Sequence, residues 1–220
     1  MSNVLVIGDQ HRPFEHPLYL KFCQDTYKRF GCNKVVNIGD EWDQCALSRY
    51  DSDPDGMSAG EEQLAAVEAS KPWYKAFPEM TLVESNHGLR IFKKAFSAGI
   101  PRIYMKAYRD FQEAPVGWVW KPNVIIDKVL YFHGEPFAGI HGHVNAAAKH
   151  RMSVVIGHIH CHAGVQYSRA LRSEIFGMNV GCGIDDTTYP FRYAQENASK
   201  PVLGCGVVLG GKEAIFVPMR

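Results

Sequence analysis

The sequence has almost no net charge, no closely paired cysteines and no long hydrophobic run. Its 220 residues include 24 Lys or Arg and 23 Asp or Glu, which gives a formal net charge of +1. So small a charge gives no whole-chain support for a plain nucleic-acid binder or for a membrane-surface protein. A local basic patch is one interpretation, and a solvated helix face another, for Lys93, Lys94, Arg102, Lys106 and Arg109.

No apolar run approaches the roughly 20 residues that a membrane helix needs. The first residues, MSNVLVIG, lead directly into an apolar stretch, without the charged segment and long apolar region of a signal peptide. We therefore expect a cytoplasmic protein with no membrane partner. The length allows a sizeable core, and we expect a single domain over residues 1–220.

The six cysteines contain no C-x-x-C pair, and this disfavours a structural zinc site built from thiolates. In a reducing compartment we expect free and mostly buried thiols. Cys161 stands between two histidines. Its alternation with His160 predicts that its sulfur points away from any metal that His160 binds.

Apolar runs alternate with amphipathic stretches through the first half of the chain. This β-α-β-α order is typical of a layered α/β protein. We expect strands over 3–8, 34–38 and 80–84, and helices over 17–30, 60–77 (bent or ended by Pro72) and 89–97. The second half is expected to be rich in strands, at 118–120, 124–126, 129–132, 153–157, 174–180, 203–209 and 214–217, with one helix over 144–151.

Five short polar clusters each follow an apolar run. In α/β sheets, ligands gather beyond the carboxyl ends of the strands, where loops converge. We therefore expect residues far apart in the sequence to form one site. The clusters are Gly8-Asp9-Gln10-His11, Gly39-Asp40-Glu41-Trp42-Asp43, Ser85-Asn86-His87, His133-Gly134 and Gly157-His158-Ile159-His160.

The clusters combine carboxylates, imidazoles and one amide. Asp9 and His11 can turn toward one ion where the strand opens into a loop, and Asp40 can bridge two cations. Asn86 offers a neutral oxygen. Such a mixed set suits Mn, Fe, Zn or Ni better than Ca or an all-oxygen Mg site. The remaining nitrogen donors are His133, His158 and His160.

In order and spacing, these motifs resemble those of the calcineurin-like metallophosphoesterases: D-x-H, G-D-x-x-D, G-N-H-[D/E], H and G-H-x-H. The resemblance covers residues 8–160, and the compact length is like that of phage or bacterial members. It implies a four-layer α-β-β-α sandwich, with two mixed β-sheets face to face and helices outside. It also implies two divalent transition-metal ions, Mn²⁺ ahead of Fe, Zn or Ni. The implied ligands are Asp9, His11 and His160 for the first ion, Asn86, His133 and His158 for the second, and Asp40 as the bridge.

The resemblance also implies how the site works. Two metal ions lower the pKa of a shared water from about 16 toward roughly 7, and the hydroxide attacks phosphorus. His87 is implied to be the catalytic residue that protonates or stabilises the leaving oxygen. The family's usual Gly is Ser85 here, and its usual acidic residue after the histidine is Gly88. We therefore expect another carboxylate to orient His87, or its pKa to be raised less. Asp43 is expected to support the site from outside the ligand set.

Three residues are candidates for substrate binding. Arg90 follows His87 at a spacing that is often seen in this family. It is expected either to bind a phosphate oxygen or to be a surface arginine on the first turn of a helix. His141 and His143 lie in a loop that should hang over the site, where either one contacts phosphate or both are simply loop residues nearby. A later stretch walls the pocket, stacks on a base or packs in the β-rich half: Asp185, Asp186, Tyr189, Phe191 and Tyr193.

These observations favour a dinuclear metal-dependent phosphoesterase. We favour a phosphodiester substrate, nucleotide or nucleic acid, because Gly88 replaces the acidic partner of His87 and an aromatic stretch follows the last motif. A phosphomonoesterase or protein phosphatase is the close alternative. A catalytically silent member of the family, kept for binding a metal or ligand, is a third hypothesis.

Overall fold

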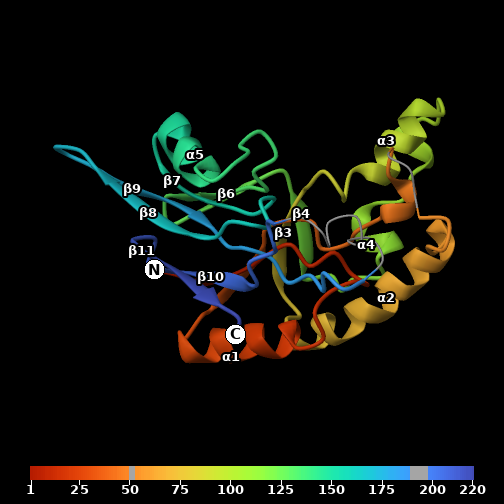
Figure 1. Cartoon of the computed structure of the whole chain (residues 1–220), viewed down its shortest axis with the longest axis horizontal. Coiled ribbons are helices and arrows are strands. Elements are labelled where there is room, and N and C mark those ends of the chain that lie inside the picture. The colour runs from red at the N-terminus through yellow and green to blue at the C-terminus, as the bar shows by residue number, and fades with distance from the viewer. Residues whose placement is uncertain (50–52, 189–197) are drawn as a thin grey trace.

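Two β-sheets lie face to face in this computed structural model, which describes residues 1–49, 53–188 and 198–220 (Figure 1). The strands are β1 (Asn3–Ile7), β2 (Lys34–Asn37), β3 (Met80–Val83), β4 (Trp118–Lys121), β5 (Val124–Ile126), β6 (Val129–Tyr131), β7 (Ser153–Ile156), β8 (Gly164–Arg169), β9 (Glu174–Asn179), β10 (Gly204–Leu209) and β11 (Glu213–Pro218). The helices are α1 (Tyr19–Arg29), α2 (Ala59–Ala76), α3 (Arg90–Ser97), α4 (Tyr108–Phe111) and α5 (Gly142–His150), with short 3₁₀ turns η1 (Cys45–Leu47) and η2 (Arg102–Tyr104).

Both sheets are mixed. The six-stranded sheet has the order β11-β10-β1-β2-β3-β4, in which β1 to β4 are parallel and β10 and β11 are antiparallel to their neighbours. The five-stranded sheet has the order β5-β6-β7-β9-β8, with β6, β7 and β9 parallel. The parallel centres bring the carboxyl ends of five strands to one side of the molecule: β1, β2 and β3 from one sheet, β6 and β7 from the other.

Strict alternation along β1 divides its side chains between two cores. Val4 and Val6 face the other sheet, where they join a buried cluster that includes Tyr131 and Met178. Leu5 and Ile7 face the other way, toward a cluster completed by helix residues that include Tyr19, Cys23, Trp73 and Phe77. Because side chains alternate along a strand, a central strand that is buried on both faces reads as a continuous apolar run.

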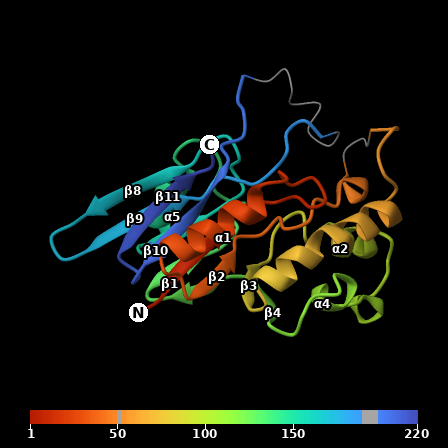
Figure 2. The same ribbon diagram turned by 90° about the horizontal axis from the view of Figure 1, so that it is seen from below.

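Helices lie outside both sheets: α1 and α2 are in front in Figure 2, and α5 lies on the opposite side of the molecule, beside β6 and β7, in Figure 1. The first of these layers is α1 and α2 on the six-stranded sheet. On the five-stranded sheet, Ala146 and Ala147 of α5 pack against Leu130, Val154 and Ile156. The expected four-layer α-β-β-α sandwich is therefore confirmed. Among the described residues, no helix is both long and apolar enough to cross a membrane.

Most expected elements are present within a residue or two of their predicted bounds. Three points stand out. Helix α2 continues through Pro72 to Ala76, which agrees with the expected range of 60–77 and excludes the alternative that Pro72 ends it. Helix α5 begins at Gly142, ahead of the predicted residue 144. Strand β8 was not predicted, because most of its side chains are exposed and polar and give no apolar alternation.

Candidate metal centre

Five strand ends from the two sheets meet at one site. Asp9 follows β1 and Asp40 follows β2, both in the six-stranded sheet, whereas His158 follows β7 in the five-stranded sheet. The backbone N–H of His158 donates to Asp9 Oδ2 at 2.7 Å, which joins the two sheets directly at the site. The convergence expected from the sequence is therefore present.

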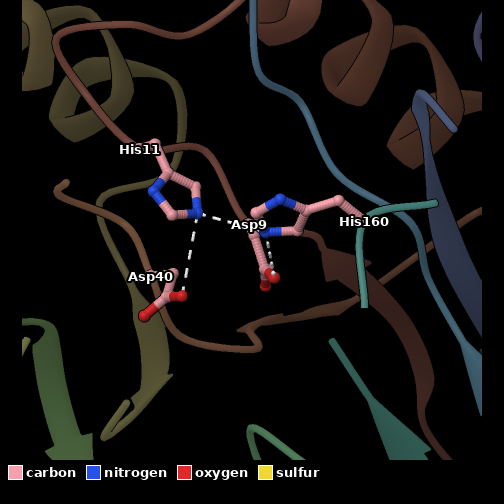
Figure 3. A group of neighbouring side chains, drawn as sticks. All are labelled: Asp9, His11, Asp40 and His160. Atoms are coloured by element: carbon pink, nitrogen blue, oxygen red, sulfur yellow. Dashed lines mark hydrogen bonds and ion pairs between the residues drawn. The ribbon is translucent and has the colours of Figure 1, made fainter. Parts of the chain in front are cut away.

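The first group of donors is Asp9, His11, Asp40 and His160, whose ligand atoms all lie within 4.8 Å of one another. Their polar atoms point into a common space (Figure 3). His160 Nε2 lies 3.1 Å from Asp9 Oδ2 and 3.2 Å from His11 Nε2. Asp40 Oδ2 lies 3.7 Å from His11 Nε2. The geometry matches one cation position with two imidazoles and two carboxylates.

The second group contains Asp40 again, together with His133 and His158, within the same 4.8 Å limit. His133 Nε2 lies 3.3 Å from Asp40 Oδ2 and 3.2 Å from His158 Nδ1. Asn86 Oδ1 lies 2.7 Å from His133 Nε2. Asp40 takes part in both of these groups. A third group of possible ligands, His11, Asp43 and His87, does not contain it.

Two of the imidazoles are oriented from behind by hydrogen bonds. His133 Nδ1 lies 3.0 Å from the carbonyl oxygen of Ile38, and His11 Nδ1 lies 2.6 Å from Asp43 Oδ1. In each case a proton on Nδ1 is donated outward, and this leaves Nε2 facing the site. Such outer partners fix the tautomer and ring orientation of metal-binding histidines.

The backbone is strained where the ligands are placed. His11, Asp40 and His158 have φ values of 53°, 47° and 68°, in the left-handed region that side chains rarely adopt. The N–H groups of Gln10 and His11 both donate to the carbonyl oxygen of Asp40, at 3.0 and 2.9 Å, and hold the first two loops together. Strain of this kind gathers at functional sites, where the surrounding structure fixes it.

At two glycines, the lack of a side chain leaves space for the candidate ligands. Gly39 has a φ of 103°, and a Cβ there would lie 2.8 Å from His133 Nδ1. A Cβ on Gly157 would collide with Asp9 Oδ1 and would lie 2.5 Å from Ile38 Cγ2. Close approach therefore requires both glycines, and its positive φ is a second reason for glycine at Gly39.

The charges in the site strongly perturb one another. Burial alone raises the pKa of Asp40, but the imidazoles of His133, His87 and His11 outweigh it and hold that pKa well below its ordinary value. Burial lowers the pKa of His133, yet the Asp40 carboxylate raises it to about 9. For His11, burial and the charge of His87 prevail and lower the pKa.

The donor set fits divalent transition-metal ions. Asp9 Oδ1 is buried and has no hydrogen-bond partner among the described residues, although a buried carboxylate is costly unless it is paired. Nitrogen faces nitrogen at 3.2 Å in two places, His11 with His160 and His133 with His158, and this needs a proton or a cation between the rings. Carboxylate, imidazole and amide donors around two adjacent positions satisfy those needs together.

The catalytic candidate, His87, lies beside the ligands. Its Nε2 is 3.9 Å from Asp40 Oδ2, and its Nδ1 is 2.7 Å from the carbonyl oxygen and 3.0 Å from the carboxylate of Asp43. Asp43 therefore provides the orienting carboxylate that Gly88 cannot. Burial lowers the pKa of His87, but Asp40 and Asp43 outweigh it and raise that pKa.

Arg90 reaches this histidine from the first turn of α3. Its Nη2 lies 3.0 Å from His87 Nε2, and its Nη1 donates to the carbonyl oxygens of Asp43 and Gln44 at 2.9 and 3.2 Å. Arg90 is thus placed at the site and is not a free surface side chain. Its role in binding phosphate remains a prediction.

The other candidates differ in how far they are exposed. His141 is exposed, and His143 is half-buried with a buried Nδ1 that has no hydrogen-bond partner in the described part of the chain. Burial and the nearby His141 and His162 lower the pKa of His143. Neither belongs to the two ligand groups. Cys161 packs against the apolar cluster around α5, as expected. Of the later stretch, Tyr189, Phe191 and Tyr193 lie outside the described residues, and Asp185 and Asp186 are half-buried.

Ser85, inside a motif, and Arg12, next to one, have roles that the sequence did not indicate. Ser85 Oγ accepts hydrogen bonds from the N–H groups of Asp40, at 2.8 Å, and Gly88, at 3.3 Å. The guanidinium of Arg12 is buried between two tryptophan rings, Trp73 and Trp118, at 5.8 and 5.6 Å from their centroids. The signal for Arg12 was its place next to His11 in a buried loop, but nothing in the sequence identified its partners.

Comparisons with known proteins give distant structural likenesses. No family model matches the chain, and no curated protein matches it either. Vacuolar protein sorting 29 from Cryptosporidium parvum is 12% identical over 94% of this chain and 85% of its own, with a TM-score of 0.44. The phosphoesterase YfcE from E. coli is 14% identical over 93% and 87%, also at 0.44. The nuclease MPE from Pseudomonas putida is 13% identical over 95% and 85%, at 0.32. Likenesses this low do not determine activity.

Proposed function

We propose that this protein is a dinuclear metal-dependent phosphoester hydrolase. The observation that carries the proposal is the shared carboxylate. Asp40 lies in two of the groups of possible metal ligands, so its carboxylate could bridge two adjacent cations, and its Oδ2 lies 3.9 Å from His87 Nε2. Two adjacent cations are a recurrent device for displacement at phosphorus. We propose Mn²⁺ as the native ion, with Fe, Zn and Ni as the alternatives to be compared.

Each part of the site has a separate task in this proposal. The two metal ions, when bound, would lower the pKa of a water molecule and offset negative charge on the phosphate. His87 donates a proton to the leaving oxygen from Nε2, while Asp43 holds its Nδ1. Arg90 turns from His87 Nε2 to a phosphate oxygen when substrate enters.

The candidate ligands differ in burial, and this difference indicates the side from which a substrate could approach. Asp9, His11, Asp40 and His133 are buried, whereas Asn86, His87, His158 and His160 are half-buried. We propose that the phosphate meets the half-buried side and that His141 and His143 contact it from the loop before α5. We favour a phosphodiester of the nucleotide or nucleic-acid type over a phosphomonoester.

The test is hydrolysis of bis-p-nitrophenyl phosphate and p-nitrophenyl phosphate by metal-stripped protein, with and without Mn²⁺. Asp40→Asn is the site variant, because Asn also tolerates a left-handed backbone and keeps the side-chain shape. Asp25→Asn, at an exposed aspartate of α1, is the matched control. We expect Mn²⁺-dependent turnover that Asp40→Asn abolishes and Asp25→Asn keeps.

The two substrates separate the remaining hypotheses. Faster turnover of the bis-ester supports a diesterase, and faster turnover of the monoester supports a phosphatase. If Mn²⁺ stabilises the protein while neither ester is hydrolysed with any metal, the proposal of an enzyme fails in favour of a binding protein.

A further inference from the structure

One segment next to the site has a charge unlike that of the rest of the chain. Residues 85–109 contain six Lys or Arg and no Asp or Glu. The whole chain has 24 basic and 23 acidic side chains, so removing this segment would leave an excess of five acidic ones. The near-neutral total therefore hides a local concentration of positive charge at α3 and η2.

This segment folds back on itself around one aromatic ring. The guanidinium of Arg102, in η2, stacks on Phe92 of α3 at 4.2 Å from the ring centroid. Tyr108 of α4 meets the same ring at 5.2 Å, edge to face. The chain from α3 to α4 thus forms a defined projection at the end of the molecule opposite the β8–β9 hairpin (Figure 1).

The outer surface of this projection is both basic and apolar. Lys93, Lys94 and Lys106 are exposed, and none has an ion pair with any residue in the described part of the chain. The same surface also exposes large apolar and aromatic side chains of a kind that is more often buried. These are Phe96, Ile103 and Tyr104, which are 84%, 88% and 78% exposed.

The projection is continuous with the candidate metal centre. Arg90 opens α3 and lies 3.0 Å from His87 through Nη2. Lys93 and Lys94 follow three and four residues later, so they share the helix face of Arg90. A row of positive charge therefore runs from the catalytic histidine outward along α3.

We propose that this projection, from α3 to α4, binds a single-stranded nucleic acid, one phosphodiester of which reaches the candidate metal centre. Lysines placed along a backbone bind successive phosphates, and exposed aromatic rings stack on bases. The candidate metal centre is also proposed to bind phosphate, so one nucleic-acid strand could contact both the projection and the centre. An anionic membrane would satisfy the lysines and apolar side chains but would not extend the row into the site. The proposal rests on the proposed function for its substrate class.

The test measures binding of a fluorescein-labelled oligothymidylate by anisotropy, with a chelator present so that the strand stays intact. The variant Lys93→Ala/Lys94→Ala/Lys106→Ala should weaken binding about tenfold or more. Its salt dependence should become shallower, by about 0.7 in the logarithmic slope for each phosphate that the variant no longer neutralises. The matched control is Lys28→Ala/Lys75→Ala/Lys212→Ala, which removes three exposed lysines near the amino ends of the strands. It should leave affinity and slope unchanged.

A second pair of variants tests stacking. Tyr104→Ala should weaken oligothymidylate binding about tenfold, and Tyr104→Phe should restore it, because only the aromatic face is needed. Equal affinity in Tyr104→Ala and Tyr104→Phe would contradict stacking. Equal affinity in the two lysine triples would overturn the proposal. So would binding of phosphatidylglycerol vesicles without binding of the oligonucleotide.

Turnover of bis-p-nitrophenyl phosphate keeps this inference separate from the proposed function. The small ester does not reach the projection, so the Lys93/Lys94/Lys106 variant should hydrolyse it at the wild-type rate. Hydrolysis of the small ester without oligonucleotide binding would contradict the nucleic-acid surface and support the proposed function. Oligonucleotide binding without hydrolysis of the ester with any metal would support the binding surface and contradict the proposal of an enzyme.

Discussion

Asp43 joins two histidines that have different proposed tasks. Its Oδ1 lies 2.6 Å from Nδ1 of His11, a proposed metal ligand, and 3.0 Å from Nδ1 of His87, the proposed acid. Burial raises the pKa of Asp43, but hydrogen bonds from both imidazoles outweigh it and keep the pKa far below its ordinary value. One ionised carboxylate thus positions both the metal centre and the proton donor.

Replacing that carboxylate should therefore weaken two properties at once. In Asp43→Asn, which keeps the shape of the side chain, we expect Mn²⁺ affinity and turnover each to fall about 10–100-fold. Titration calorimetry with Mn²⁺ and ester hydrolysis measure the two effects. Asp25→Asn again serves as the control. An Asp43→Asn protein with wild-type affinity and wild-type turnover would show that Asp43 positions neither histidine.

The roles of single residues could be predicted only where their type and spacing carry the information. Asp9, Asp40 and His158 were identifiable because a polar ligand directly after an apolar strand is an unusual position. The double contact of Asp43 was not, because it depends on where His87, which is 44 residues away, is placed. The burial of Arg12 was hidden for the same reason, since its tryptophans come from α2 and β4.

At the scale of elements, the junction after β7 depends on a missing side chain. Gly157 lies where a Cβ would collide with the Asp9 carboxylate and with Ile38. We expect Gly157→Ala to lower the free energy of unfolding by about 1–3 kcal/mol, as overpacked cores do. It should also weaken Mn²⁺ binding, because Asp9 must move. Urea denaturation and metal titration measure these changes.

Gly60 provides the contrast for that experiment. It lies in the first turn of α2, where an added Cβ would meet nothing within 4 Å. Gly60→Ala should be neutral or stabilise the protein by up to about 1 kcal/mol, because alanine loses less backbone freedom in a helix. If both substitutions changed stability and Mn²⁺ affinity alike, close approach at Gly157 would not explain its glycine.

Elements with two buried faces were predictable, and elements outside the core were not. Strands β1 and β7 read as apolar runs because both faces are covered. Strand β8, a partner of β9 at the sheet edge, has exposed residues such as Tyr167 and carries no such pattern. Pro72 did not end α2, since the helix around it is fixed by packing of Trp73 and by a capping box at Ser58.

At the scale of the whole molecule, the metal centre depends on the two sheets meeting. Asp9, Asp40 and Asn86 come from one sheet, and His133 and His158 from the other. The sequence predicted that these strand ends converge, but pairing across sheets follows from long-range packing that no local pattern encodes. The sandwich itself came from the resemblance, and the two apolar clusters on either side of β1 confirm it.

A centre that joins two sheets should couple metal binding to global stability. A ligand that binds the folded state alone stabilises it in proportion to the logarithm of its concentration above Kd. We therefore expect the Tm of metal-stripped protein to rise steadily with added Mn²⁺, and the rise to be much smaller in Asp40→Asn. Differential scanning calorimetry measures both. An equal rise in the two proteins would place the stabilising ions elsewhere.

The most direct measurement is a titration of metal-stripped protein with Mn²⁺, in which bound metal and hydrolysis of bis-p-nitrophenyl phosphate are followed together. Because Asp40 lies in both ligand groups, activity should rise to a limit only as the second equivalent binds. In Asp40→Asn, activity should be lost. Full activity at one equivalent, or turnover that survives in Asp40→Asn, would contradict a dinuclear centre bridged by Asp40.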